Sequence, residues 1–248
     1  MFVKTVTDRR LFSQETLSVL ETSNLIEPVY PAATVVLMRD CEEGIEVLLV
    51  QRNKAVQHMG GMWVFPGGKV DEADYPGDRN EYQAAVNAAI RETREEAGLS
   101  VTADQLVYLS HWTTPEGAKK RFATWFFLAI LDDEQEVQVD GGEIARHRWA
   151  EPSAALAESQ DLEHSLRLMP PSYVSLSDIA DCQTCAEAQR RVAERDAIIY
   201  APRIAFVEGG ICFLYAGDAG YSDSNLDVKG GRHRLYMIND QLEYIRQL

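Results

Sequence analysis

Three glutamates on one predicted helix, with a Gly-Gly pair upstream, are the residues of this chain whose spacing best indicates chemistry. Residues 91–99 read Arg-Glu-Thr-Arg-Glu-Glu-Ala-Gly-Leu, and residues 65–68 read Phe-Pro-Gly-Gly. On a helix, Glu92, Glu95 and Glu96 fall within an arc of roughly 100°. Carboxylates that close repel one another, so a cation is expected in front of them. Hard divalent cations such as Mg²⁺ take oxygen ligands and leave room for phosphate oxygens. The pattern therefore predicts a metal-dependent enzyme that acts on phosphates.

Chain length and net charge limit the number of domains and the classes of binding partner. With 248 residues, the chain can hold one large domain or one domain with an appendage. A net charge of −15 argues against a nucleic-acid-binding surface, although a metal site can still attract a small anionic substrate. The N-terminal residues lack the pattern of a secretion signal, and no apolar run is long enough to span a bilayer. We therefore expect a cytoplasmic protein without a nucleic-acid or membrane partner.

The elements that must position the three glutamates can be predicted from local pattern. Residues 31–50 are typical of a β-hairpin, and residues 62–65 of a short strand that leads into the Gly-Gly pair. A helix is expected from about Arg79 to Ala97, with Asp78 as its N-cap and Gly98 after its end. Ala85 and Ala88 continue the carboxylate face, and their small side chains are expected to leave space for a ligand.

The rest of the chain predicts more strands, then helices, then strands again. Strands are expected at 105–111, 124–130 and 147–149, followed by a helical region at 151–194 that Pro170-Pro171 interrupts. The last fifty residues predict two hairpins, at 203–215 and 234–246.

The Gly-Gly pair followed by Arg-Glu-x-x-Glu-Glu-x-Gly-apolar resembles the signature of the Nudix hydrolases. The resemblance covers roughly residues 31–150. It implies an α/β fold, an α/β/α sandwich around a mixed sheet, with a C-terminal helical and β-hairpin extension. It also implies cleavage of phosphoanhydrides in nucleoside diphosphates linked to another group, with Mg²⁺ or Mn²⁺ as cofactor. The domains expected are 1–150, with an N-terminal extension at 1–30, and 151–248, packed on the core.

The resemblance assigns roles to individual residues. Glu95 and Glu96 match the main metal ligands, and Glu92 matches a further ligand or a base. The carbonyl of Gly67 is expected to complete the metal shell, and Arg91 to pair with and orient the carboxylates.

One part of the family signature is not found at its usual place. The family usually has five residues between the second Gly and a glutamate, then seven before the arginine. The position counted back from Arg91 holds Gln83, and the interval from Gly68 to Arg91 is longer than usual. An insertion within 69–82 would explain both facts, and Glu81 could supply the missing carboxylate.

Glu143 and Arg121 each allow both a functional and a purely structural interpretation. Glu143, after Gly141-Gly142, sits where many family members have a loop glutamate that binds metal or acts as base, and it could equally be a solvated loop acid. Arg121, next to Lys119 and Lys120, could bind a phosphate or belong to an exposed basic turn. Arg52 and Lys69 are the other basic residues expected to bind substrate; both belong to runs that resemble those of coenzyme A and acyl-coenzyme A diphosphatases.

Several of these runs resemble the longer, peroxisome-associated acyl-coenzyme A diphosphatase branch and its bacterial relatives. They cover residues 31–39, 63–71 and 121–129, with Thr114-Pro115-Glu116 between the last two. The resemblance implies that coenzyme A or an acyl-coenzyme A is split into 3′,5′-ADP and (acyl-)4′-phosphopantetheine. ADP-ribose or dinucleotide hydrolysis, and a non-catalytic nucleotide sensor, are the alternatives. Residues 151–248 are expected to cover the end of the site away from the metals, to form a homodimer interface, or to do both.

Overall fold

The computed structural model describes residues 28–56, 59–118, 120–131, 135–161 and 166–248. The predicted N-terminal extension, residues 1–30, therefore lies almost wholly outside the described residues. Contacts divide the described chain into two units, one of 30–112 with 122–199 and the other of 113–121 with 200–248. This division differs from the boundary predicted at residue 150. No helix within the described ranges is long and apolar enough to cross a membrane.

The larger unit is built on an eight-stranded sheet. Its strands run in the order β3-β2-β1-β6-β5-β8, while β4 pairs with β1 and β7 pairs with β2. The predicted hairpin is confirmed, because Cys41 pairs with Gly44 across a two-residue turn between β1 and β2. The bounds are β1 Val29–Cys41, β2 Gly44–Arg52, β3 Trp63–Val64, β4 Gly67–Lys69, β5 Val107–Thr113, β6 Arg121–Ile130, β7 Ile144–Ala150 and β8 Ile198–Tyr200.

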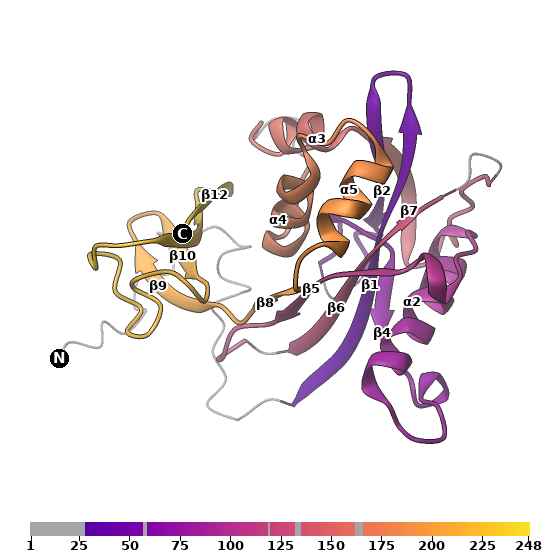
Figure 1. Cartoon of the computed structure of the whole chain (residues 1–248), viewed down its shortest axis with the longest axis horizontal. Coiled ribbons are helices and arrows are strands. Elements are labelled where there is room, and N and C mark those ends of the chain that lie inside the picture. Colours follow the sequence, from indigo (N-terminus) through magenta and orange to yellow (C-terminus); the bar gives the residue numbers. More distant parts are fainter. Residues whose placement is uncertain (1–27, 57–58, 119, 132–134, 162–165) are drawn as a thin grey trace. The chain divides into compact units, whose positions relative to one another are not determined.

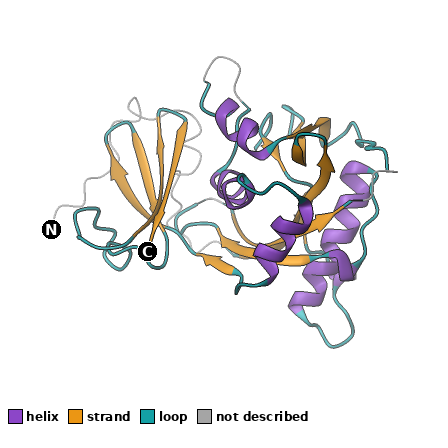
Figure 2. Ribbon diagram, turned by 45° about the horizontal axis from the view of Figure 1, so that its top comes forward, coloured by secondary structure: helices purple, strands orange, loops and turns teal. Residues whose placement is uncertain are grey.

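Helices cover both faces of this sheet. The long helix α2 lies on one face, and α3, α4 and α5 lie on the other (Figures 1 and 2). This arrangement confirms the expected α/β/α sandwich. The helices span Glu81–Ala97 (α2), Pro152–Glu158 (α3), Pro170–Ile179 (α4) and Cys185–Ala193 (α5), and the short 3₁₀ turns are η2 Glu72–Asp74 and η3 Ala103–Gln105.

The helical region predicted at 151–194 is divided into α3, α4 and α5, and its predicted interruption at Pro170-Pro171 coincides with the start of α4. The two prolines can begin α4, since Pro in the first turn removes only N–H groups that have no partner within the helix.

Helix α2 begins two residues later than predicted. Arg79 has a φ of +56°, which a right-handed helix cannot include, so the helix starts at Glu81. Asn80, and not Asp78, is the N-cap, and its side-chain oxygen accepts a hydrogen bond from the backbone N–H of Gln83. The predicted end is confirmed, since Gly98 adopts the left-handed conformation with a φ of +70°.

The alanines of α2 have a different role from the one predicted. Ala85 and Ala88 are fully buried in the hydrophobic core that α2 forms with the sheet, so they leave no space for a ligand. Their small side chains let the helix backbone lie close to strand residues such as Val35 and Leu48, which belong to the same core.

The C-terminal residues form a sheet of their own. The two predicted hairpins are confirmed, and they pair through β10 and β11 into one four-stranded antiparallel sheet of order β12-β11-β10-β9. The strands are β9 Arg203–Val207, β10 Gly210–Leu214, β11 Arg232–Ile238 and β12 Gln241–Gln247. All five residues of β10 are buried, so both faces of this strand are covered.

A buried ion pair fixes the long connection between β10 and β11. Arg234 donates to both carboxylate oxygens of Asp218 at 2.7 Å, and the two side chains are 3% and 0% exposed. The same carboxylate accepts the backbone N–H groups of Gly220 and His233 at 2.8 Å. Burial raises the pKa of Asp218, but Arg234 and the two amides outweigh it and bring this pKa to about 2.

The low pKa of Asp218 predicts that the stability of the C-terminal sheet decreases in acid. The folded pKa of Asp218, about 2, lies below the ordinary value of 3.8, so the carboxylate stabilises the folded state above pH 3.8. The contribution, roughly 2 kcal/mol, is lost as the pH falls from about 4 to 2. We expect the difference in unfolding free energy between the wild type and Asp218→Asn to shrink over this window. Urea unfolding at several pH values measures it, and a constant difference would contradict the prediction.

Candidate active site

Arg91 is the centre of the candidate site on α2. Its Nε and Nη2 atoms donate to the two oxygens of Asp74 at 3.0 and 2.8 Å, and Nη2 also donates to the carbonyl of Lys69 at 2.9 Å. Asp74 is 5% exposed and lies at the end of η2, just before the exposed loop that precedes α2. Burial raises the pKa of Asp74, but its bonds with Arg91 and the backbone lower it further, so the carboxylate stays ionised.

Asp74, and neither Glu81 nor Gln83, is therefore the residue of this segment that the structure places against Arg91. Both of those side chains are exposed on the first turn of α2, and neither has a contact with Arg91. The signal for Asp74 was in the sequence, because five residues separate it from Gly68. Counting forward from the glycines finds Asp74, whereas counting back from Arg91 crosses the insertion and misses it.

The other half of the Arg91 guanidinium contacts the glutamates. Its Nη1 atom donates to Glu92 at 2.8 Å and to Glu95 at 3.0 Å. Burial raises the pKa of Glu92, and Arg91 opposes this shift. Arg91 thus connects the buried aspartate of η2 with two carboxylates of α2, and it fixes the directions in which they point.

Glu96 lies deepest of the three glutamates. Its side chain is 7% exposed, and one carboxylate oxygen accepts the backbone N–H of Gly67 at 2.9 Å. The nearest cation is Arg52, whose Nη1 lies 3.8 Å from the other oxygen. Burial, together with the charges of Glu92 and Glu143, raises the pKa of Glu96 to about 8 in the metal-free protein. An added cation would favour the ionised form of this buried carboxylate.

The two glycines let the chain approach these carboxylates closely. A Cβ on Gly67 would lie 2.3 Å from the carbonyl oxygen of Ala33 on β1, and a Cβ on Gly68 would lie 2.3 Å from Oε1 of Glu92. Both contacts are far shorter than any real Cβ contact allows. The absence of side chains at these positions is therefore a condition for the position of Glu92 and for the pairing of β4 with β1.

We expect Gly68→Ala to lower hydrolytic activity at least about tenfold, since a catalytic group displaced by about 1 Å can lose up to a hundredfold. The new methyl group would push the Glu92 carboxylate aside, and the fold would tolerate this because Glu92 is a flexible side chain. Gly77→Ala is the matched control, because a Cβ there meets no atom within 4 Å. Equal turnover by the two variants would contradict the expectation.

Glu143 lies next to Arg52, at the other edge of the site. Nη2 of Arg52 is 3.2 Å from a Glu143 oxygen, so one guanidinium contacts both Glu143 and Glu96. The Glu143 side chain is 65% exposed, which keeps it accessible to a water molecule. The structure thus brings together two residues that the sequence placed 91 positions apart.

The side chains of Lys69 and Arg121, the other predicted substrate-binding residues, have contacts of their own. The Lys69 ammonium lies 4.7 Å from the ring centroid of Tyr30, and only its backbone carbonyl contacts Arg91. Arg121 belongs to the smaller unit and donates to the carbonyl of Thr114 at 3.2 Å. Lys119 lies outside the described residues. A phosphate-binding role for Lys69 and Arg121 stays a prediction.

The donor set fits a hard divalent cation. In the described part of the chain, no three acidic, histidine or cysteine side chains already converge as ligands; Arg91 lies between Glu92 and Glu95. The oxygens available from Glu92, Glu95 and Glu96 are nevertheless the type that Mg²⁺ and Mn²⁺ prefer. The burial of Glu96, whose side chain is 7% exposed, supports the fit from this structure itself, since a buried carboxylate is stabilised by a cation beside it.

Known proteins resemble this chain over most of its length. The model of the NUDIX domain family matches residues 29–170. A protein named as nudix hydrolase 7 of Caenorhabditis elegans is 25% identical over 230 residues, covering 78% of this chain and 75% of the relative. A protein of Mycobacterium tuberculosis named as 8-oxo-dGTP diphosphatase 3 is 27% identical over 201 residues. This match covers 79% of this chain and 82% of the relative.

Two further matches are shorter or more distant. An acyl-coenzyme A diphosphatase of Xenopus laevis is 28% identical over 145 residues, 56% of this chain, and the match spans only 37% of that relative. The crystal structure of a NUDIX hydrolase from Alicyclobacillus acidocaldarius shares the fold, with a TM-score of 0.59 and 22% identity over 67% of this chain and 97% of that one. The matched domain covers more than half of the chain, and the chain belongs to the Nudix hydrolase family.

Proposed function

We propose that this Nudix hydrolase cleaves the phosphoanhydride bond of a nucleoside-diphosphate-linked substrate, with coenzyme A or an acyl-coenzyme A as the preferred substrate. The observation that carries the proposed chemistry is the α2 carboxylate cluster, with Glu96 buried against Gly67 and Arg91 holding Glu92 and Glu95. The preference for coenzyme A esters is supported by the similarity to an acyl-coenzyme A diphosphatase.

Glu92, Glu95, Glu96 and the carbonyl of Gly67 would hold the metal ions. Bound Mg²⁺ or Mn²⁺ would neutralise the diphosphate and make a coordinated water more acidic. Arg91 orients the carboxylates, and Arg52 is near enough to both Glu96 and Glu143 to contact a phosphate between them.

The reaction requires one water and one proton acceptor. The water oxygen forms a bond with one phosphorus, the bond from that phosphorus to the bridging oxygen breaks, and the other phosphate leaves with the bridging oxygen. Glu92 or Glu143 would accept the water proton, and both lie in the site described above. With a coenzyme A ester the products are 3′,5′-ADP and the acyl-4′-phosphopantetheine.

A second substrate class has its own support. The relative named as an 8-oxo-dGTP diphosphatase matches more of this chain, 79%, than the acyl-coenzyme A diphosphatase does, 56%. Hydrolysis of an oxidised nucleoside triphosphate is therefore the second candidate, and it would use the same carboxylates.

A substrate panel separates the candidates. The purified protein would be incubated with coenzyme A, short- and long-chain acyl-coenzyme A, 3′-dephospho-coenzyme A, ADP-ribose, a dinucleoside polyphosphate and 8-oxo-dGTP. Each assay would contain Mg²⁺ or Mn²⁺, and products would be identified by mass. We expect 3′,5′-ADP from the coenzyme A esters, loss of activity with a chelator, and recovery when either metal is restored.

Other outcomes identify the alternatives. Preferred turnover of ADP-ribose or of the dinucleoside polyphosphate, with release of AMP, would indicate the first alternative, and preferred release of pyrophosphate from 8-oxo-dGTP would indicate the second. No turnover on any compound would favour a nucleotide sensor. Activity that survives thorough chelation would contradict the metal-dependent mechanism.

A further inference from the structure

The loop that carries Glu143 is held by one carboxylate. Asp140 Oδ2 accepts the backbone N–H groups of Gly142 at 3.2 Å and Glu143 at 2.8 Å, and its Oδ1 accepts that of Ile144 at 2.9 Å. Three consecutive amides therefore converge on one side chain. Charge-assisted bonds of this kind are stronger than bonds between neutral groups, so they restrict the loop more than neutral contacts would.

Asn53 holds the same loop from the opposite side. Its backbone N–H donates to the carbonyl of Glu143 at 2.7 Å, and its side-chain amide donates to the carbonyl of Gly142 at 3.2 Å. Asn53 directly follows Arg52 at the end of β2. The segment that carries Arg52 and the loop that carries Glu143 are thus joined by two hydrogen bonds.

The backbone on each side of Glu143 is also constrained. Ile144 is fully buried in the core and begins β7, and Gly141 adopts a φ of +71°, which favours glycine. The Glu143 side chain itself is 65% exposed, and its carboxylate lies 3.2 Å from the Arg52 guanidinium. Because a side chain so exposed has little packing, its position depends on the backbone that Asp140 and Asn53 hold.

We propose that Asp140 and Asn53 are positioning residues that act on the reaction through Glu143, by holding its carboxylate beside Arg52 and Glu96. The inference rests on the proposed function, in which Glu143 is a candidate proton acceptor. The inference adds that the loop positions the Glu143 carboxylate independently of α2, whereas Glu92 is positioned by α2 itself. The loop between β6 and β7 therefore determines the position of Glu143, and α2 determines the positions of Glu92, Glu95 and Glu96.

A double-mutant cycle tests this coupling. The values of kcat and KM would be measured for the wild type, Asp140→Ala, Glu143→Gln and the double variant, on the best substrate of the panel. We expect Glu143→Gln to lower kcat by about a hundredfold or more, as for a general base. We expect Asp140→Ala to lower kcat about tenfold in the wild type, with KM little changed, and to have almost no further effect in the Glu143→Gln background.

Two further variants calibrate the cycle. Asn53→Ala removes the side-chain bond to Gly142, together with the bond that Asn53 Oδ1 accepts from the backbone N–H of Ala55. It keeps the backbone bond to Glu143, so its effect should be smaller than that of Asp140→Ala. Glu136→Ala is the matched control, since Glu136, like Asp140, is an exposed acid between β6 and β7. It should leave kcat unchanged.

Hydrogen exchange provides a readout that does not depend on activity. In Asp140→Ala, and more mildly in Asp140→Asn, amides 142–144 should exchange at least about tenfold faster, while those of α2 stay unchanged. Unchanged exchange in the loop would overturn the proposal about Asp140 and Asn53. Absence of turnover on every substrate would instead contradict the proposed function, and the exchange measurement would still test the loop. Equal losses of kcat from Asp140→Ala in both backgrounds would overturn it as well. Full activity of Glu143→Gln would reject Glu143 as proton acceptor, and the coupling with it.

Discussion

Glu96→Gln should lose nearly all hydrolytic activity while the protein remains folded. We expect kcat/KM to fall by roughly a thousandfold, or about 4 kcal/mol of transition-state stabilisation, because the substitution removes a charged ligand of the proposed metal site. The fold should survive because the amide oxygen of Gln can still accept the N–H of Gly67. Burial of the negative charge opposes ionisation of Glu96 in the metal-free protein, so its removal should not lower the melting temperature.

The test needs activity, metal affinity and stability from the same preparation. Glu81→Gln is the matched control, because it makes the same chemical change on an exposed face of the same helix. Titration with Mn²⁺ should give weaker binding for Glu96→Gln and unchanged binding for Glu81→Gln. Near-normal turnover of Glu96→Gln would rule out the metal site as proposed.

Asp218→Ala should have the largest effect on stability. It leaves Arg234 buried with its charge uncompensated, and breaking a buried ion pair in this way costs about 3–5 kcal/mol. The backbone amides of Gly220 and His233 would lose their acceptor at the same time. Replacing both charged residues, as in Asp218→Leu with Arg234→Met, should restore part of the loss.

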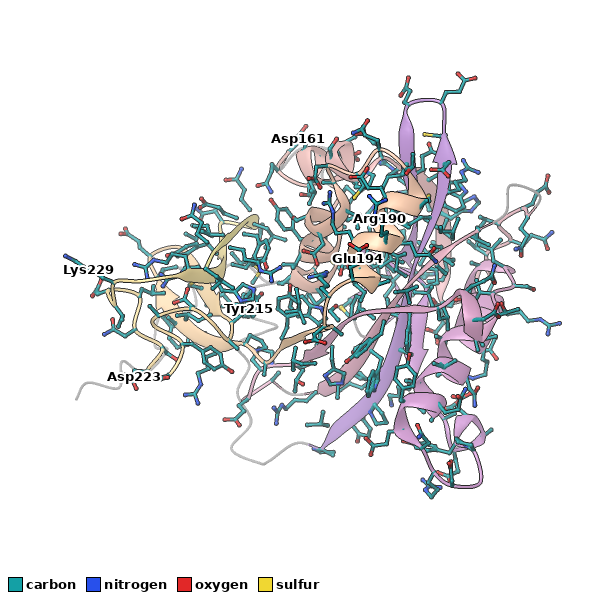
Figure 3. All side chains as sticks on the ribbon, in the orientation of Figure 1. Asp161, Arg190, Glu194, Tyr215, Asp223 and Lys229 are labelled. Carbon is teal, nitrogen blue, oxygen red and sulfur yellow. The ribbon has the colours of Figure 1, made fainter. Side chains whose placement is uncertain are left out.

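The chain offers a clean way to locate this effect. All four tryptophans, Trp63, Trp112, Trp125 and Trp149, precede the C-terminal sheet, so tryptophan fluorescence does not report on 200–248 directly. Hydrogen exchange of β9–β12 measures the sheet itself. Asp223→Ala is the control, because Asp223 lies exposed on the same connection (Figure 3). Exchange in Asp218→Ala no faster than in this control would contradict the prediction.

The parts of the site that depend on local geometry could be read from the sequence. Glu92, Glu95 and Glu96 share one face because residues three and four apart on a helix are neighbours. The two C-terminal hairpins were predictable for a similar reason, since alternating strands and their turn residues are adjacent in sequence. Their union into one sheet through β10 and β11 was not, because it is a pairing between hairpins.

The misassigned residues depend on contacts between distant segments. The helical period places Ala85 and Ala88 on a face, but only tertiary packing determines that the sheet covers this face. Likewise, nothing near Asp218 in the sequence indicates its pairing with Arg234, 16 positions away. In both cases the residues are buried by segments distant in sequence, so their burial becomes visible only once the whole fold is known.

The contact between Asp74 and Arg91 also has a consequence for how such enzymes are recognised. These two residues are 17 positions apart, and the segment between them includes seven exposed residues, 77–83. The contact is made in space, so chemistry places little limit on how many residues the chain inserts there. A sequence pattern with a fixed interval would reject this chain, whereas one that allows a variable gap would retain it. Gly77, where an added Cβ meets no atom within 4 Å, is accordingly where an affinity tag or a fluorescent reporter could be inserted without moving Arg91.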